Sequence, residues 1–350
     1  LTRSVGYRLL SGPLAAQVMV EIGENITSPA PAVKPKAPST SPSKQPYSID
    51  GISIETIDDE RFRVVISTTA KADVSSSYSV DPPTLGLTFE RATLSPSVTA
   101  PAEAHPLLAS LSYDQVSRSP AVARISLSLQ RIVAYDVRID DRATVLTVRL
   151  PDKAGGSLAG KLVVIDPGHG GREKGACSGS NYEKDVNLRI ARALAEALQR
   201  EGARTRLTRD GDETLSLASR PGVAVATGAD IFISIHCNST SIANSASGIE
   251  TYYHMYESSP RALAYAVHQG VCATTGMCDR KARSDRSLHT SGLAVLRHLS
   301  GSGIPGILLE CGYLNHSSDR ARLLSQAYRE KLAAGIVLGL KAYVEGAPLR

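Results

Sequence analysis

One stretch of the sequence indicates the class of fold: Lys161-Leu162-Val163-Val164-Ile165-Asp166-Pro167-Gly168-His169-Gly170-Gly171. It joins four consecutive apolar residues to a Gly/Pro turn that displays one histidine. An unbroken apolar run of this kind is typical of a strand buried on both faces, as in parallel α/β sheets. Ligands of such sheets bind beyond the carboxyl ends of the strands. His169 therefore occupies a position where a ligand-binding residue is expected.

Downstream of this stretch, segments with strand and helix periodicity alternate. Strands are expected at 203–207, 231–236, 248–253 and 304–310, helices at 185–201, 260–274 and 318–345, and broken helical sequence at 215–227. The alternation predicts an α/β domain over 161–346 whose mostly parallel sheet is flanked by helices on both faces. His169, His236 and Glu310 each stand at the end of an expected strand, so they should lie along one edge of that sheet.

Two histidines and a carboxylate at a sheet edge are typical of a metallohydrolase. Catalytic zinc takes three protein ligands, often two His and one carboxylate, and keeps a fourth position for water. The spacing alone does not choose the carboxylate. The acids available are Asp166, Glu173, Glu183, Asp185, Glu196 and several later ones.

The region upstream has a different pattern. Over 49–150, apolar and polar residues alternate in six segments: 52–56, 61–66, 85–89, 123–129, 135–139 and 145–150. This period of two predicts an all-β, sandwich-like domain, joined to the α/β domain by a connector at 151–160. The Pro/Ser-rich segment 28–48 predicts an extended linker. Residues 1–27 are then expected to be the remnant of a preceding β domain. The spacing from Tyr7 to Val18 equals that from Tyr135 to Leu146, which indicates either a partial repeat or a chance alignment of two strand pairs.

Composition narrows the possible classes of protein. The chain has 350 residues and a formal net charge of +5, and no concentrated Lys/Arg run points to nucleic acid. No apolar run approaches membrane-spanning length. The chain begins at Leu1 without a leader, so we expect a processed or truncated product that carries no signal peptide. Five cysteines without a Cys-x-x-Cys pair argue against a zinc ribbon, while Cys272 and Cys278 could pair or remain free thiols.

Four blocks of the α/β region resemble zinc-dependent N-acetylmuramoyl-L-alanine amidases. They are residues 163–171, Glu183-Lys184-Asp185-Val186-Asn187-Leu188, residues 229–238 and Glu310-Cys311-Gly312-Tyr313-Leu314, in the order found in that family. The resemblance implies that His169, Glu183 and His236 hold one Zn²⁺ and that Glu310 is the catalytic acid/base. Residues 46–150, with Tyr135-Asp136-Val137 before the final strand, resemble the AMIN domain, a module that targets wall hydrolases to peptidoglycan.

The resemblance also implies an activity and a location. Zinc-activated water would cleave the amide bond between N-acetylmuramic acid and the L-alanine of the stem peptide, with peptidoglycan as the partner and the periplasm or cell wall as the compartment. A zinc exopeptidase or endopeptidase acting on wall peptides is the first alternative. A non-catalytic wall-binding protein is the second. The sequence leaves the oligomeric state open.

Several further residues carry expectations of their own. If the strands keep their pleat, Cys237 and Cys311 point away from His236 and Glu310 and pack in a core. His254, His268, His289, His298 and His316 are expected at the surface or in packing, although His316 and Asn315 depart from the residues common in the family. Residues 248–253 are placed to form a groove wall, and Asp166 is a candidate to orient His169. Residues 239–247 are too few for the helix that blocks the zinc in some relatives, so we expect activity without an activator.

Overall fold

The computed structural model describes residues 6–11, 18–23, 45–80, 82–99, 101, 104–151, 155–255 and 257–346. The chain divides into two compact units, Leu1–Pro42 and Ser43–Arg350. In the first unit, β1 (Gly6–Ser11) and β2 (Val18–Gly23) form an antiparallel hairpin in which Tyr7 pairs with Ile22. The equivalent tyrosine of the proposed repeat, Tyr135, pairs with Val148. The strand pairs β1–β2 and β10–β11 are both antiparallel hairpins, but the strands are aligned differently in the two. The expected linker falls outside the described residues up to position 44.

The described residues between Tyr47 and Arg149 form nine strands: β3 (Tyr47–Asp58), β4 (Arg61–Thr68), β5 (Asp73–Val80), β6 (Pro83–Glu90), β7 (Ala92–Leu94), β8 (Leu108–Arg118), β9 (Ala121–Leu129), β10 (Ala134–Ile139) and β11 (Ala143–Arg149). They form a five-stranded sheet, β10-β11-β4-β3-β7, and a four-stranded sheet, β5-β6-β9-β8. Both sheets contribute to one core, for example through Phe62 of β4 and Phe89 of β6. All six expected strands are present in this strand-rich region.

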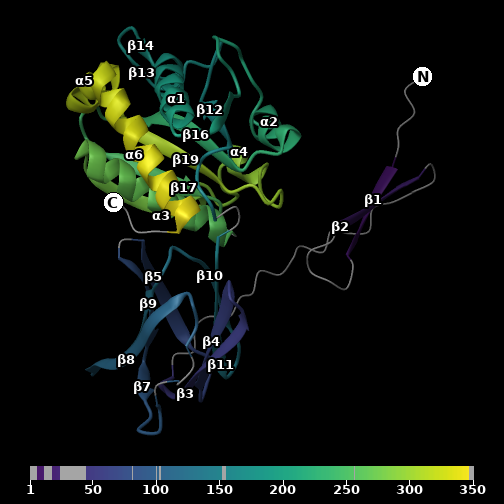
Figure 1. Cartoon of the computed structure of the whole chain (residues 1–350), viewed down its shortest axis with the longest axis vertical. Coiled ribbons are helices and arrows are strands. Elements are labelled where there is room, and N and C mark those ends of the chain that lie inside the picture. Colours follow the sequence, from purple (N-terminus) through teal and green to yellow (C-terminus); the bar gives the residue numbers. More distant parts are fainter. Residues whose placement is uncertain are drawn as a thin grey trace. The chain divides into compact units, whose positions relative to one another are not determined.

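The α/β region contains β12 (Leu162–Pro167), β13 (Cys177–Ser178), β14 (Asn181–Tyr182), α1 (Glu183–Arg200), β15 (Arg204–Leu207), α2 (Ser219–Thr227), β16 (Ile231–Asn238), β17 (Ile249–Tyr253), α3 (Ser258–Thr275), β18 (Asp279–Ser284), α4 (Ala294–Arg297), β19 (Gly306–Tyr313), α5 (Ser317–Leu324) and α6 (Gln326–Glu345). Its sheet has the order β15-β12-β16-β19-β17-β18. Figure 1 labels the four central strands, β12, β16, β19 and β17. The sheet is mixed, because β17 runs antiparallel to β19 while the other pairs are parallel. The short connection from β16 to β17 carries no helix, and without a crossover the chain returns in the opposite direction.

The pleat of the parallel strands divides their side chains between two cores. Val163, Ile165 and Ile233 pack with α1, α3 and α6, whereas Val164 and Phe232 pack with α2 and α4 on the other face. The helices therefore cover both faces of the sheet, as the sequence predicts (Figure 1). Even-numbered residues at the strand ends, which include Asp166 and His236, share the face that α2 and α4 cover.

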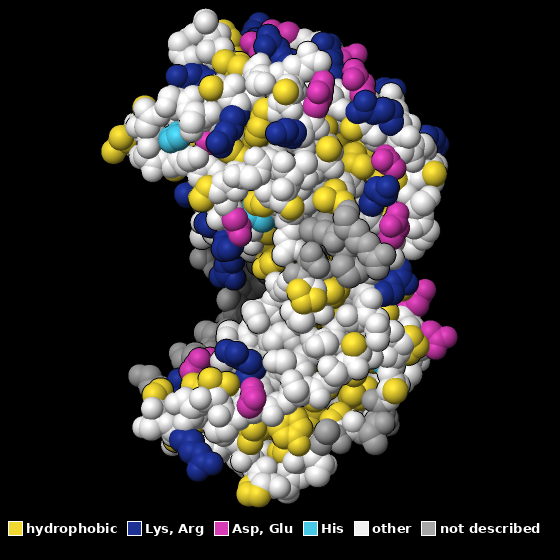
Figure 2. Space-filling model, turned by 60° about the vertical axis from the view of Figure 1, so that its left-hand side comes forward, with side chains coloured by type: hydrophobic (Ala, Val, Ile, Leu, Met, Phe, Trp, Pro, Cys, Tyr) yellow, Lys and Arg dark blue, Asp and Glu magenta, His cyan; other side chains and the backbone are white. Residues whose placement is uncertain are grey.

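Basic and acidic side chains are interspersed on the face shown in Figure 2, and no single basic patch stands out there. In the part of the chain that the structure describes, no helix combines the length and apolar character needed to cross a membrane. The five cysteines, all within described segments, are free thiols.

Candidate active site

The turn after β12 places His169 by an unusual backbone conformation. His169 has a φ of 61°, in the left-handed region that disfavours residues with a Cβ, at a cost of about 1–3 kcal/mol. Gly168 precedes it, and a Cβ there would lie 2.3 Å from Cε1 and Nε2 of His236. The turn is held from outside by Arg220, whose Nη2 donates to the carbonyl of His169 at 2.8 Å. Because a Cβ at position 168 would clash with His236, Gly168 is required for the close approach of the turn to β16.

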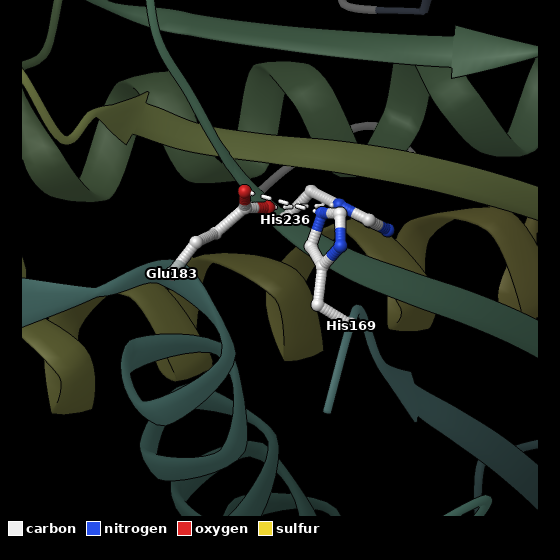
Figure 3. Close-up of side chains that lie close together, drawn as sticks. All are labelled: His169, Glu183 and His236. Carbon is white, nitrogen blue, oxygen red and sulfur yellow. Dashed lines mark hydrogen bonds and ion pairs between the residues drawn. The ribbon is translucent and has the colours of Figure 1, made fainter. Parts of the chain in front are cut away.

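Three side chains from separate elements converge in front of this turn (Figure 3). Glu183, the first residue of α1, contacts both rings: its Oε2 is 3.2 Å from Nε2 of His169 and its Oε1 is 2.9 Å from Nδ1 of His236. One ligand atom from each residue lies within 4.8 Å of the other two, a spacing that could hold a metal ion. Two imidazoles and one carboxylate are the donor set of many catalytic zinc sites. The residues present therefore fit zinc.

Glu183 is fixed by backbone and side-chain donors. Its Oε2 accepts from the amide of Ala176 at 2.7 Å, and its Oε1 accepts from the amide of Cys237 at 3.1 Å and from Nδ2 of Asn187 at 3.2 Å. Burial opposes ionisation, but the hydrogen bonds with His169 and His236 outweigh it and lower the pKa of Glu183 well below its usual range. Glu183 is therefore a carboxylate at neutral pH, the form that binds a metal.

Glu310 lies beside this cluster on the neighbouring strand. In the register of the sheet it pairs with His236 of β16 on one side and with Glu250 of β17 on the other. Its Oε2 is buried and has no hydrogen-bond partner. Burial, with a further contribution from the negative charges of Glu183 and Glu250, raises the pKa of Glu310 well above its usual range. A raised pKa favours the protonated form of this carboxyl group, which can donate a proton, and the ionised form can accept one.

Asp166 supports the turn, but through a partner that the sequence did not single out. The Asp166 carboxylate is fully buried and accepts from Nη1 of Arg220 at 2.8 Å, from the Thr208 hydroxyl at 2.6 Å and from the Ser234 hydroxyl at 2.7 Å. Arg220 in turn holds the carbonyl of His169. The hypothesis that Asp166 orients His169 therefore takes an indirect form, in which the guanidinium group carries the effect to the backbone.

Arg209 adds a second guanidinium group under the same turn. Its side chain donates to the carbonyls of Pro167 at 3.0 Å and Gly168 at 3.1 Å, and to the carbonyl of Lys184 in α1 at 2.8 Å. It therefore ties the histidine turn to the helix that begins with Glu183. The sequence predicted no role for Arg209, Arg220 or Asn187, because isolated residues of these types carry no periodic signal.

A pocket of about 390 Å³ opens beside His169 and His236. Its further lining includes Leu217 of the segment before α2 and residues 291–295 before and within α4. Asp285, which is fully buried, fixes that second segment by accepting from the amide of Leu293 at 2.9 Å. Residues 248–253, which were expected to form a groove wall, do not line this pocket. The strand β17 is an interior strand of the sheet, and Glu250 on it faces Glu310.

The remaining expectations can be placed as well. Cys237 and Cys311 are buried in the core on the far side of the sheet, away from the histidine face, as the pleat predicts. His316 accepts from the amide of Asp319 and caps α5, so its departure from the family pattern concerns a helix end. His268 was expected at the surface or in packing. It lies in a second group of possible metal ligands, together with Cys272 and Asp279.

Comparison with known proteins gives matches over the α/β region. Residues 163–342 match the family described as N-acetylmuramoyl-L-alanine amidase. The chain is 36% identical over 202 residues to YqiI of Bacillus subtilis (strain 168), which is 57% of this chain and 93% of that protein. It is 34% identical over 189 residues to the "Probable cell wall amidase LytH" of Staphylococcus aureus, covering 53% of this chain and 59% of that one.

Solved structures similar to this region include two amidases. The N-acetylmuramoyl-L-alanine amidase of Clostridium difficile 630 is 35% identical, with a TM-score of 0.49, over 53% of this chain and 97% of that one. The amidase AmiC2 of Nostoc punctiforme is 36% identical, with a TM-score of 0.48, over 53% and 99%.

Proposed function

Because the chain belongs to the N-acetylmuramoyl-L-alanine amidase family, we propose that it hydrolyses the amide bond between N-acetylmuramic acid and the L-alanine of the peptidoglycan stem peptide. His169, Glu183 and His236 would hold one zinc ion, and Glu310 would be the catalytic acid/base. Since peptidoglycan lies outside the cytoplasm, we also propose action in the periplasm or cell wall.

The single observation that carries this proposal is the unpaired carboxyl group of Glu310 beside a two-histidine, one-glutamate cluster. When bound, zinc would acidify a water molecule and polarise the scissile carbonyl group. Glu310 takes a proton from the attacking water and returns it to the departing amine of L-alanine, so the two proton transfers balance. The products are a free stem peptide and a glycan with an unsubstituted lactyl carboxylate.

The surrounding residues position this chemistry. Asn187 and the amides of Ala176 and Cys237 fix the Glu183 carboxylate, and Arg220 fixes the backbone of His169. Such outer contacts orient ligands and tune their basicity. The pocket of about 390 Å³ is within the size range of small-ligand sites and would take the part of the substrate next to the scissile bond.

Digestion of purified sacculi tests the proposal. Wild-type protein is expected to release peptides with a new L-alanine amino terminus, whereas Glu310→Gln should retain zinc and release none. Glu196→Gln, at an exposed position of α1, is the matched control and should keep full activity. New termini other than L-alanine would indicate a peptidase. A protein that binds no zinc and releases no peptide would indicate a non-catalytic wall-binding role.

We further propose that 49–150 are an AMIN domain that binds peptidoglycan, separated by 151–160 from a catalytic domain at 161–346. Support comes from the core that the two β sheets share. A chain lacking the first 150 residues is expected to cleave soluble muropeptides at the wild-type rate but to be retained less by sacculi. Equal retention of both chains on sacculi would contradict the targeting role.

A further inference from the structure

A second cluster of metal-binding side chains lies where α3 ends and β18 begins. His268 and Cys272 are four residues apart on α3 and share one face of the helix. Asp279, the first residue of β18, completes the group. Nε2 of His268 is 2.8 Å from Oδ1 of Asp279 and 3.5 Å from Sγ of Cys272, and the three ligand atoms lie within 4.8 Å of one another.

We propose that His268, Cys272 and Asp279 form a second site for a divalent transition metal of the zinc class. An imidazole, a thiolate and a carboxylate are all ligands that zinc accepts, and three protein ligands leave a position for water. Hard cations such as Mg²⁺ prefer oxygen donors, so the sulfur and nitrogen donors select against them. Binding would release the proton of the Cys272 thiol to solvent.

Thr251 prepares His268 for this role. Nδ1 of His268 is 3.0 Å from the Thr251 hydroxyl, which is fully buried on β17. A hydroxyl group can donate or accept, so it can hold either tautomer of the ring. In the metal-free protein Nε2 carries the hydrogen and donates to Asp279. With a metal on Nε2, the hydrogen moves to Nδ1 and is donated to Thr251, and the ring keeps its orientation.

Asp279 combines a fixed position with access to solvent. Asp279 is held by Lys281, whose backbone amide donates to Oδ1 at 2.8 Å and whose Nζ lies 2.8 Å from Oδ2. The Asp279 side chain remains 46% exposed, whereas that of His268 is 5% exposed. The cluster is therefore rigid on its buried side and open to an entering ion on the other.

Cobalt titration of the metal-free full chain in the presence of a reductant tests the site. Co²⁺ occupies zinc sites and, unlike Zn²⁺, has an absorption spectrum that reports its ligands. A thiolate bound to Co²⁺ gives an intense near-ultraviolet charge-transfer band, and the cluster of His169, Glu183 and His236 has no sulfur donor. Wild-type protein is expected to bind two equivalents and to show this band. Cys272→Ser should lose the band and one equivalent, whereas Cys177→Ser, at an exposed cysteine on β13, should keep both.

Asp279→Asn is the second variant, since its exposed position leaves folding intact, and it should weaken the second equivalent at least about tenfold. Glu183→Gln should weaken only the equivalent without a thiolate band, which separates the two sites. Wild-type protein that binds one equivalent without the band would overturn the proposal. A band that survives in Cys272→Ser would overturn it too.

Discussion

Replacing Arg220 with methionine should reveal how strongly the histidine turn depends on one buried ion pair. The Arg220 side chain is 3% exposed and its partner Asp166 is fully buried. Methionine keeps much of the aliphatic length but removes the guanidinium group. Asp166 would retain its bonds from Thr208 and Ser234 but would lose its countercharge.

The expected loss follows from this geometry. Removing one member of a buried pair typically costs about 3–5 kcal/mol, because the remaining charge stays buried without compensation. Against a typical unfolding free energy of about 5–15 kcal/mol, this is a large fraction. In the double variant Asp166→Asn/Arg220→Met no charge remains. The double variant should therefore lose less unfolding free energy than the two single variants lose together, by at least about 1 kcal/mol.

Urea unfolding of the metal-free proteins, followed by helical ellipticity, measures these losses. The α-helices of the described segments all lie between Glu183 and Glu345, so the signal reports the α/β region. Arg192→Met is the matched control, because Arg192 pairs with Asp210 at the exposed surface and should cost no more than about 1 kcal/mol. If Arg220→Met costs no more than Arg192→Met, or if the double variant is additive, the buried pair does not stabilise the turn as argued.

Other substitutions and treatments probe separate features. Gly168→Ala should displace the His236 ring and lower zinc affinity at least about tenfold in a chelator-competition titration; unchanged affinity would contradict the close-approach argument. Gly339→Ala, whose Cβ would lie 2.4 Å from Cα of Val267, should cost about 1–3 kcal/mol in urea unfolding, whereas Gly222→Ala, with open space around it, should cost nothing. A chelator should lower the unfolding midpoint of wild-type protein more than that of Glu183→Gln, which retains only the proposed second site; equal shifts would place the stabilising metal elsewhere. The purified chain should digest sacculi without an added partner, since 239–247 contain no helix, and a strict requirement for an activator would refute this.

Much of the fold follows from periodicity in the sequence. Apolar runs mark β12, β16 and β19 because these strands are buried on both faces, and their ends bring His169, His236 and Glu310 together. The strand β18 was missed because its sequence, Asp-Arg-Lys-Ala-Arg-Ser, is polar, as is common for an edge strand with one exposed side. The reversal of β17 was missed because strand direction depends on the connection and not on the strand residues.

The candidate site was predictable only where its residues stand at strand ends. Periodicity left the choice of carboxylate open, and the resemblance to a known family pointed to Glu183. In the structure Glu183 is held by the amides of Ala176 and Cys237, contacts between segments far apart in the sequence. Arg220 and Asp166 illustrate the same limit, since their pairing joins α2 to β12. Such tertiary contacts leave no pattern in a single sequence.

The alternation of faces along β16 makes the site sensitive to strand alignment. His236 faces the pocket and Cys237 faces the opposite core, so deletion of one upstream residue of this strand would move Cys237 into the place of His236 and turn His236 toward that core. The thiol would then meet Glu183 and His169, while an imidazole would be forced among aliphatic side chains. Natural variation in length should therefore be confined to segments such as 239–247, while β16 should tolerate replacement of its residues far better than any change in their number.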